Sequence, residues 1–269
     1  MYEIREIDER RGRGVFSLIK LAQGTIITSV RCPLSVLYSP FVRTHCGFCF
    51  IEVAESAWMC TDCRHYALCA VCDCEGLRAA HEGWCQWFRM LPEAVRAGDT
   101  DYVRFVLEYC ARILRGDTDL LEEIRKLTFA DIDAAFCESF SARIVERFGP
   151  HGLAVSSEHI AGVIRRTKTN SLGFPFDSER TLGWSIHSEL CMLNHSCIPN
   201  CAIRRSSSVP GAAELVAVTD VERGDELTIS YIDVESFPDV VARTTHLLER
   251  YAFLCRCELC QSQRKSSRR

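Results

Sequence analysis

Several features that would place the chain in a special class are missing from its sequence. No apolar run approaches the roughly 20 residues that a transmembrane helix needs. The first thirty residues are rich in charge, with Glu3, Arg5 and Glu6 at the start, and therefore predict no signal peptide. The formal net charge of -4 argues against a surface dominated by nucleic-acid binding, although a local basic patch is compatible with it. No internal repeat is present.

These absences leave an ordinary soluble, globular composition. Hydrophobic residues make up 47% of the chain and charged residues 25%. A chain of 269 residues can bury a large core in one elaborated domain or in two small ones.

Cysteine is the residue present in excess. There are 17, an odd number that fits disulfide pairing poorly. In a chain without a secretory signal, paired cysteine spacings indicate metal sites in a reducing compartment. Thiolate and imidazole ligands favour zinc, and closed four-ligand shells leave no position for a reactive water, so such sites are structural. Four ligand pairs between residues 46 and 85 predict two zinc ions: Cys46 and Cys49, Cys60 and Cys63, Cys69 and Cys72, and His81 and Cys85.

A further cysteine group lies near the C-terminus. Cys255, Cys257 and Cys260 are spaced C-x-C-x-x-C. Three thiolates fill only part of a tetrahedral shell, so this group predicts a third zinc whose fourth ligand comes from elsewhere in the chain.

The apolar patterns predict short strands towards both ends of the chain and helices between them. Strands are expected within residues 13–30 and at Cys201–Arg205, Glu214–Thr219 and Glu226–Ser230. A first helix is expected to be capped by Asp99 or Asp101 and to end at Gly116. A second is expected from Phe129 to Phe148, stopped by the Gly-Pro pair that follows. Its apolar residues are expected in the core rather than in a ligand site: Ile132, Phe136, Phe140, Ile144 and Val145.

Four short segments carry a family resemblance. The most specific is Asn194-His195-Ser196-Cys197-Ile198-Pro199-Asn200. The others are Arg11–Phe16 (RGRGVF), Gly224–Tyr231 (GDELTISY) and Tyr251–Cys260 (YAFLCRCELC). In this order they resemble the SET-domain lysine methyltransferases, and the block from Cys46 to Cys85 resembles a MYND zinc finger. Together they resemble the SET-and-MYND family of protein methyltransferases over nearly the whole chain.

The resemblance implies an α+β fold whose centre is the SET-domain β-clip core of short strands. It further implies five segments: the N-terminal part of the SET domain at 1–45, a MYND-type double-zinc finger at 46–85, a helical SET insert at 86–165, the C-terminal part of the SET domain at 166–254, and a post-SET zinc segment with a basic tail at 255–269. Many family members continue into a helical-repeat domain, which this chain, ending soon after Cys260, is not expected to contain. We therefore expect a more open substrate groove.

The same resemblance distributes the metal ligands. In the MYND pattern the pairs interleave, so that Cys46, Cys49, Cys69 and Cys72 would hold one ion and Cys60, Cys63, His81 and Cys85 the other. The usual third pair is spaced C-x3-C, which makes Cys74, and less readily His65, alternatives to Cys72. For the C-terminal site the family places Cys197 beside Cys255, Cys257 and Cys260. That link would fold the C-terminus over the active site and position Tyr251 and Phe253.

Site residues follow from the resemblance in the same way. Methyl transfer from S-adenosylmethionine to lysine needs a neutral, well-aligned amine, which a low-dielectric channel favours. Tyr231 and Tyr251 would be the catalytic tyrosines of this channel, because their hydroxyls orient the amine and their rings tolerate cationic groups. Cofactor contacts are implied for Arg11, Gly12, Arg13, Asn170, Asn194, His195, Tyr231 and Phe253. His195 is expected to face the cofactor rather than act as a general base, and Glu226 to hold the local fold. No G-x-G-x-x-G segment follows a predicted strand, which agrees with a SET fold and not with a Rossmann site.

The main functional hypothesis is an S-adenosylmethionine-dependent protein-lysine N-methyltransferase with three zinc ions, acting on histone or non-histone proteins in the nucleus, the cytoplasm or both. The alternative is a catalytically weak or inactive adaptor whose MYND finger binds proline-rich peptides; the intact Asn194 and Tyr231 argue against it. A DNA-binding zinc protein is disfavoured because the net charge is negative and the basic residues of the finger are sparse. No membrane partner is expected.

Overall fold

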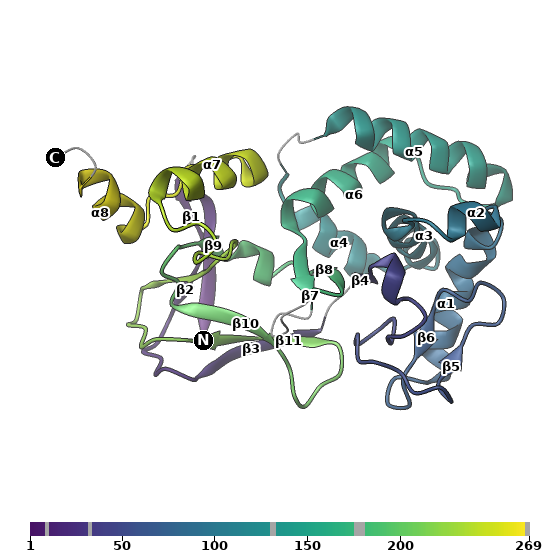
Figure 1. Ribbon diagram of the computed structural model, residues 1–269, viewed down its shortest axis with the longest axis horizontal. Coiled ribbons are helices and arrows are strands. Elements are labelled where there is room, and N and C mark those ends of the chain that lie inside the picture. Colours follow the sequence, from purple (N-terminus) through teal and green to yellow (C-terminus); the bar gives the residue numbers. More distant parts are fainter. Residues whose placement is uncertain (9–10, 32–33, 130–132, 175–180, 267–269) are drawn as a thin grey trace. The chain divides into compact units, whose positions relative to one another are not determined.

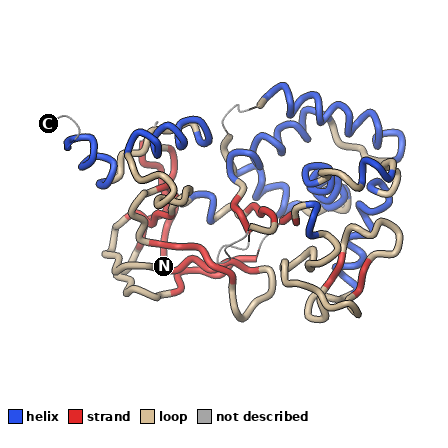
Figure 2. Tube along the Cα trace, in the orientation of Figure 1, coloured by secondary structure: helices blue, strands red, loops and turns tan. Residues whose placement is uncertain are grey.

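The computed structural model describes residues 1–8, 11–31, 34–129, 133–174 and 181–266. The chain folds into two compact units, each with its own internal contacts. The first unit is made of Met1–Val30, Glu189–Arg204 and Ala213–Arg269, and the second of Arg31–Ser188 and Arg205–Ala212. Figure 1 shows the elements of both units, and Figure 2 shows that strands dominate the first and helices the second. The second unit is thus inserted between the two halves of the first.

The first unit contains a sheet that joins segments far apart in the sequence. Its strands are β1 (Tyr2–Asp8), β2 (Gly12–Ser17), β12 (Glu226–Ile229) and β9 (Asn194–His195), in that order. β1 and β12 pair with β2 antiparallel, whereas β9 runs parallel to β12 with Asn194 opposite Thr228. This order sets three of the four family segments side by side (Figure 1).

A second sheet and three helical elements complete the first unit. The sheet has the order β10 (Cys201–Arg205), β11 (Ala212–Ala217) and β3 (Ile26–Arg31), and all six residues of β11 are buried. A short 3-10 helix, η3, spans Leu190–Met192. Helix α7 (Val240–Tyr251) begins after Asp239, whose carboxylate accepts a hydrogen bond from the amide of Ala242, and is followed by α8 (Glu258–Ser266).

The second unit combines the cysteine-rich finger with a helical layer. A three-stranded sheet has the order β4 (Leu34–Leu37), β8 (Gly183–Ile186) and β7 (Leu172–Phe174), and the finger contributes β5 (Trp58–Met59) and β6 (Ala67–Leu68). Helix α1 packs on α3, and α5 packs on α6. The helical elements are η1 (Ser39–Phe41), α1 (Glu75–Phe88), α2 (Glu93–Arg96), α3 (Asp101–Leu114), α4 (Thr118–Lys126), α5 (Ala134–Phe148), η2 (Gly149–His151) and α6 (Ser157–Asn170).

The strand predictions agree closely with the structure. β10 has the predicted bounds, and β11 and β12 overlap the predicted segments with shifts of one or two residues. The helix predicted after Asp99 is also present as α3, and Gly116 follows it with a φ of 91°. Its N-cap residue is Thr100 rather than either predicted aspartate. The Asp101 carboxylate instead accepts from the backbone amide of Ser39 and pairs with Arg104, which removes it from the cap.

Two predictions for α5 were less accurate, and one helix was missed. The helix expected from Phe129 begins at Ala134, and Ile132 lies outside the described residues. Ile144 is buried as predicted, but Phe136 is 43% exposed, so its assignment to the core was wrong. Helix α4 was not predicted at all; Asp117 caps it by accepting a hydrogen bond from Leu120. Within the described part of the chain, no helix combines the length and apolarity needed to cross a bilayer.

A buried acid on α3 makes the stability of the second unit depend on pH. Burial raises the pKa of Glu108 from 4.5 to about 7, against the attraction of Arg112 and Arg104. Between these values the folded chain keeps a proton that the unfolded chain releases, so stability decreases as the pH rises from 4.5 to about 7.

Replacing this acid should therefore stabilise the protein, and more at high pH. We expect Glu108→Gln to raise the free energy of unfolding by about 2 kcal/mol at pH 6 and about 3 kcal/mol at pH 8, as upper limits set by the size of the shift. Urea denaturation of variant and wild type at both pH values measures the difference. The exposed Glu122 supplies the control substitution Glu122→Gln. An equal gain at both pH values would contradict the assignment.

Candidate functional site

Two cysteine clusters lie in the finger of the second unit. One group contains Cys46, Cys49, Cys69 and Cys72, the other Cys60, Cys63, His81 and Cys85, and within each group the potential ligand atoms all lie within 4.8 Å of one another. The Sγ atoms of Cys49 and Cys69, and those of Cys60 and Cys85, are 3.7 Å apart. Thiolates bonded to one tetrahedral zinc at about 2.3 Å are about 3.8 Å apart. The donor atoms are therefore already spaced for a metal ion.

The interleaved pairing predicted from the sequence is the pairing that the structure forms. Cys72 lies in the first group, whereas Cys74 is exposed and belongs to neither group. His65 is not a member either, because its two ring nitrogens lie 2.6 Å from the Cys63 carbonyl oxygen and 2.7 Å from that of Arg96. None of the cysteines that the structure describes forms a disulfide.

Aromatic rings enclose His81 in the second cluster. The Tyr66 ring stacks on the imidazole at 4.5 Å with an interplanar angle of 4°, and the Trp84 ring meets it edge-on at 4.5 Å. The His81 Nε2 atom lies 3.4 Å from Cys63 Sγ. The stacking thus fixes the orientation in which His81 faces the thiols. Sequence analysis did not single out Tyr66 or Trp84, since aromatic residues inside a finger look like ordinary core.

A third cluster lies in the first unit. The Sγ atoms of Cys197, Cys255, Cys257 and Cys260 lie within 4.8 Å of one another. Cys197 comes from the loop after β9, and the other three from the turn into α8 and its first residues. Tyr231, Tyr251 and Phe253 pack against the buried members of this cluster. The structure therefore brings together the four thiols that the family resemblance implied.

A buried arginine lies beside this third cluster. Arg243 on α7 is 1% exposed, and one of its terminal nitrogens, Nη1, donates to the carbonyl oxygens of Phe237 and Pro238. The other, Nη2, lies 3.9 Å from Cys260 Sγ and also donates to the side chain of Gln263. Among the described residues it forms no ion pair with a carboxylate, and its Nε has no hydrogen-bond partner. Four thiolates around a divalent cation carry a net charge of −2, so a buried guanidinium with no acidic partner suits a metal–thiolate centre.

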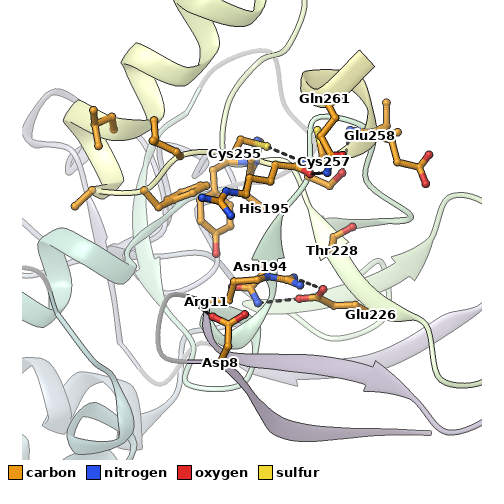
Figure 3. A pocket seen from close by; sticks show the side chains of 18 residues that line it. Asp8, Arg11, Asn194, His195, Glu226, Thr228, Cys255, Cys257, Glu258 and Gln261 are labelled. Atoms are coloured by element: carbon orange, nitrogen blue, oxygen red, sulfur yellow. Dashed lines mark hydrogen bonds and ion pairs between the residues drawn. The ribbon is translucent and has the colours of Figure 1, made fainter. Parts of the chain in front are cut away.

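A cavity of about 1190 Å³ lies next to this cluster, and its walls belong entirely to the first unit. Figure 3 shows polar side chains around it, with Asp8, Arg11, Asn194 and Glu226 gathered together and His195 near the cysteines. The remaining lining residues are Ser196, Ile198, Thr228, Tyr231, Leu248, Ala252, Phe253, Leu254, Cys255, Arg256, Cys257, Glu258 and Gln261.

Glu226 organises the polar wall. Its carboxylate accepts a hydrogen bond of 2.8 Å from the Asn194 amide and pairs with the Arg11 guanidinium, as the dashed lines in Figure 3 show. The same Asn194 amide donates to the carbonyl oxygen of Arg13 at 2.9 Å. A Cβ atom on Gly14 would come within 2.7 Å of Ile7 Cδ1 and 2.9 Å of Glu226 Oε1. A side chain at position 14 would therefore have to displace the tips of the Ile7, Glu226 and Asn194 side chains that form this arrangement.

The apolar wall is built from aromatic rings. The Tyr231 and Tyr251 rings are 5.1 Å apart, and Phe253 lies 6.1 Å from Tyr231. The Tyr231 hydroxyl donates to the Leu193 carbonyl oxygen, and the Tyr251 hydroxyl donates to that of Tyr231. Burial raises the pKa of both phenols above their usual range, so both remain hydroxyl donors at neutral pH.

His195 is neutral in this environment. Burial and, secondarily, the positive charge of Arg243 lower the pKa of its imidazole to about 4. Its Nδ1 atom accepts a hydrogen bond of 3.0 Å from the Tyr231 amide. A group with this pKa is a poor general base at neutral pH.

Not every predicted cofactor residue lines the cavity. Arg11, Asn194, His195, Tyr231 and Phe253 do, whereas Gly12 and Arg13 do not. Tyr251, predicted as a catalytic residue, is not part of the lining either. Asn170 is the last residue of α6 in the second unit, where its side chain donates to the carbonyl oxygens of Thr128 and Arg166. Its cofactor contact stays a prediction.

Comparison with known proteins identifies the family. The SET domain family model matches residues 12–232, which is most of the chain. The chain belongs to the SET-domain family. One curated relative is "N-lysine methyltransferase SMYD2-A" of Xenopus laevis, 25% identical over 95% of this chain and 60% of the relative. Another is "Histone-lysine N-methyltransferase SMYD1" of Homo sapiens, 25% identical over 96% of the chain and 55% of the relative.

A third relative supports the predicted combination of domains by name. It is "SET domain and MYND-type zinc finger protein 6" of Schizosaccharomyces pombe, 35% identical over 36% of this chain and 19% of the relative. The predicted resemblance to SET-and-MYND proteins is thereby confirmed. The SET chain spans about 60% of the length of the first curated relatives that it matches.

A solved structure agrees with the fold. The crystal structure of the SET domain of LSMT bound to lysine and AdoHcy superposes with a TM-score of 0.50 at 11% identity, covering 94% of this chain and 53% of that one. The α+β SET fold predicted from the sequence is therefore confirmed.

The close packing around Gly14 can be tested by adding one methyl group. We expect Gly14→Ala to lower the free energy of unfolding by about 1–3 kcal/mol, because the new Cβ displaces Ile7, Glu226 or Asn194. Thermal unfolding of the metal-loaded protein measures the loss. In the control Gly76→Ala, on α1, the added Cβ meets nothing within 4 Å. A Gly14→Ala protein as stable as wild type would show that the packing is looser than described.

Proposed function

We propose that the chain is an S-adenosylmethionine-dependent protein-lysine N-methyltransferase that acts on lysines of histone or non-histone proteins. The observation that carries the proposal is the meeting of two walls in one cavity. The Asn194, Glu226 and Arg11 wall is polar and rigidly hydrogen-bonded, whereas the Tyr231 and Phe253 wall is aromatic. The names of the relatives as lysine methyltransferases support this reaction, as does the lysine and AdoHcy bound to the solved SET domain.

The residues of the cavity suit the methyl donor. S-adenosylmethionine, when bound, supplies a methyl group on a positively charged sulfur. Asn194 and Arg11, which line the cavity, would hold its polar parts by hydrogen bonding. Phe253 offers a ring face for the adenine, and the rings of Tyr231 and Tyr251 tolerate positive charge. A volume of about 1190 Å³ exceeds the roughly 300–1,000 Å³ of common ligand sites, which leaves room for a substrate side chain as well.

The substrate lysine must present a neutral amine. A free lysine is almost wholly protonated at neutral pH, and a wall of buried aromatic rings disfavours the ammonium form. The raised pKa values of Tyr231 and Tyr251 keep both hydroxyls protonated. The Tyr231 hydroxyl can therefore orient the amine by hydrogen bonding without competing for its proton, and the Tyr251 hydroxyl supports Tyr231 by donating to its carbonyl oxygen. Alignment of this kind is the main contribution that a protein makes to a displacement at carbon.

We further propose that the three cysteine clusters bind zinc. Cysteine with a single histidine is the donor set of structural zinc, and such sites persist in the reducing nucleus or cytoplasm. The two finger sites would fix the finger, and the third would hold the segment that carries Phe253 at the cavity. On the finger, Val71 and Ile51 are 76% and 45% exposed, which suits contact with an apolar, proline-rich peptide.

Zinc content tests the ligand assignment. We expect three zinc ions per wild-type chain, two in Cys257→Ser, and three in the matched variant Cys74→Ser, whose thiol is exposed and outside the clusters. Elemental analysis of the purified, dialysed proteins gives the counts. Three ions in Cys257→Ser, or two in Cys74→Ser, would overturn the ligand set.

Calorimetric titration with S-adenosylmethionine tests the proposed reaction without knowledge of the substrate. Wild type should bind, and Asn194→Ala should bind at least about 10-fold more weakly, because one side chain bridges Arg13 and Glu226. Tyr231→Phe should keep donor binding, since only a hydroxyl is lost, yet transfer methyl groups to lysine in a histone or a protein-array substrate about 100-fold more slowly.

The outcomes separate enzyme from adaptor. A folded wild type that binds no donor would favour the adaptor, and a screen of proline-rich peptides against the finger would follow. Wild-type transfer rates in Tyr231→Phe would remove that residue from the catalytic assignment.

A further inference from the structure

His195 contacts two groups that the proposed function treats separately. Its Nδ1 atom lies 3.0 Å from the Tyr231 backbone nitrogen, and its Nε2 atom lies 3.3 Å from Cys197 Sγ. The imidazole ring thus spans the gap between the third cysteine cluster and the aromatic wall of the cavity. It also faces the Phe253 ring, with 5.9 Å between centroids.

The contacts settle which nitrogen carries the proton. A backbone N–H can only donate, so His195 Nδ1 must be the acceptor of the bond from Tyr231. A neutral imidazole then carries its single hydrogen on Nε2, which points at Cys197 Sγ. This tautomer suits a thiolate at Cys197, because a sulfur without a proton can only accept a hydrogen bond, here from the Nε2–H group.

A second donor also faces the cluster. Arg243 Nη2 approaches Cys260 Sγ on the same cluster, so donors from two directions face the four sulfur atoms. Donors outside a metal's ligand shell orient the ligands and offset their charge, and removing one costs about 10- to 100-fold in metal affinity. His195 differs from Arg243 in that its second nitrogen reaches the active-site tyrosine.

We propose that His195 is a positioning residue that couples metal binding at the Cys197 cluster to the placement of Tyr231. The inference rests on the proposed function, since it assumes a metal at this cluster and a role for Tyr231. When Cys197 is a metal-bound thiolate, the Nε2–H bond fixes the ring, and the fixed ring holds the Tyr231 amide. Tyr231 in turn directs its hydroxyl to Leu193. Without the metal, no shared ion holds Cys197 in place, so its sulfur and the His195 ring bonded to it lose that restraint, and the Tyr231 amide loses a fixed acceptor.

Two substitutions separate the two contacts of His195, the one with the Tyr231 amide and the one with Cys197 Sγ. The Oδ1 atom of His195→Asn can take the place of Nδ1 and accept from Tyr231, but its side chain is too short to reach Cys197. The amide nitrogen of His195→Gln can take the place of Nε2 and donate to Cys197, but no acceptor remains for Tyr231. The control is His246→Gln on α7, a histidine that stacks on Phe237 away from the cluster.

Zinc affinity reports on the contact with Cys197, and nuclear magnetic resonance reports on the contact with the Tyr231 amide. Neither measurement requires methyl transfer. Competition with a chelator should show the third zinc bound about 10- to 100-fold more weakly in His195→Asn, and within a few-fold of wild type in His195→Gln. The ¹⁵N shifts of His195 should report hydrogen on Nε2. The amide proton of Tyr231 should keep its hydrogen-bonded shift in His195→Asn and lose it in His195→Gln. In wild type, removal of the third zinc should shift it as well.

The proposal is overturned if both substitutions weaken zinc equally, if hydrogen is found on Nδ1, or if the Tyr231 amide does not respond to zinc removal. A failure of the proposed function has another signature, namely a wild type that binds no S-adenosylmethionine. The zinc and resonance measurements use no donor, so the two failures are distinguishable.

Discussion

The parallel pairing of β9 with β12 is the contact on which the first unit depends. It is only two residue pairs long, with Asn194 opposite Thr228 and His195 opposite Ile229. Without it the Asn194 amide would not reach Glu226, and the His195 ring would not lie under the Tyr231 amide. So short a ladder cannot persist alone. Side-chain hydrogen bonds reinforce it, including those from Asn200, which accepts from the Thr228 amide and donates to the Glu226 carbonyl oxygen.

The C-terminal segment depends on its cysteine side chains to hold it in place. Its buried apolar side chains are few: Val240 and Leu247 from α7, and Cys255 and Cys260 beyond it, packed on Cys197. Ala252 sits between them with a left-handed φ of 59°, which reverses the chain after α7 so that Phe253 returns to the cavity. A non-glycine residue in that conformation costs of order 1 kcal/mol, and the contacts on either side must hold it there. Tetrahedral coordination by four cysteines supplies such a constraint from a small number of residues.

The metal clusters could be predicted because their ligands are closely spaced in the sequence. Contacts between residues far apart in the sequence could not be predicted in this way. Each C-x-x-C pair indicates metal binding within four consecutive residues. Cys197 lies far from Cys255 in the sequence, so no spacing could identify it as a ligand, and only the SET resemblance did. Whether Cys72 or Cys74 joins the cluster depends on which thiol the turn before α1 directs inward, and Cys74 points to solvent. Glu226 was expected to hold the local fold and does so, but its partners could not be named in advance, because Arg11 and Asn194 are 215 and 32 residues away in the sequence. Helical periodicity placed Phe136 on an apolar stripe correctly, but a pattern cannot show whether another element covers that stripe. Helix α4 escaped notice because it is short and mostly charged, so its cap at Asp117 was its main signal.

The insertion of the second unit imposes an order on folding. β2 cannot pair with β12 until β12 has been synthesised. Phe16 pairs with Glu226, which leaves the ribosome more than two hundred residues later. The inserted segment from Arg31 to Ser188 has its own contacts and can form while the N-terminal hairpin of β1 and β2 has no further sheet partner. Pairings of such long sequence separation are slow to form, and an unpaired strand edge is prone to associate with other chains in the meantime. During synthesis, the edge of β2 that later pairs with β12 is thus a place where a chaperone would prevent association with other chains.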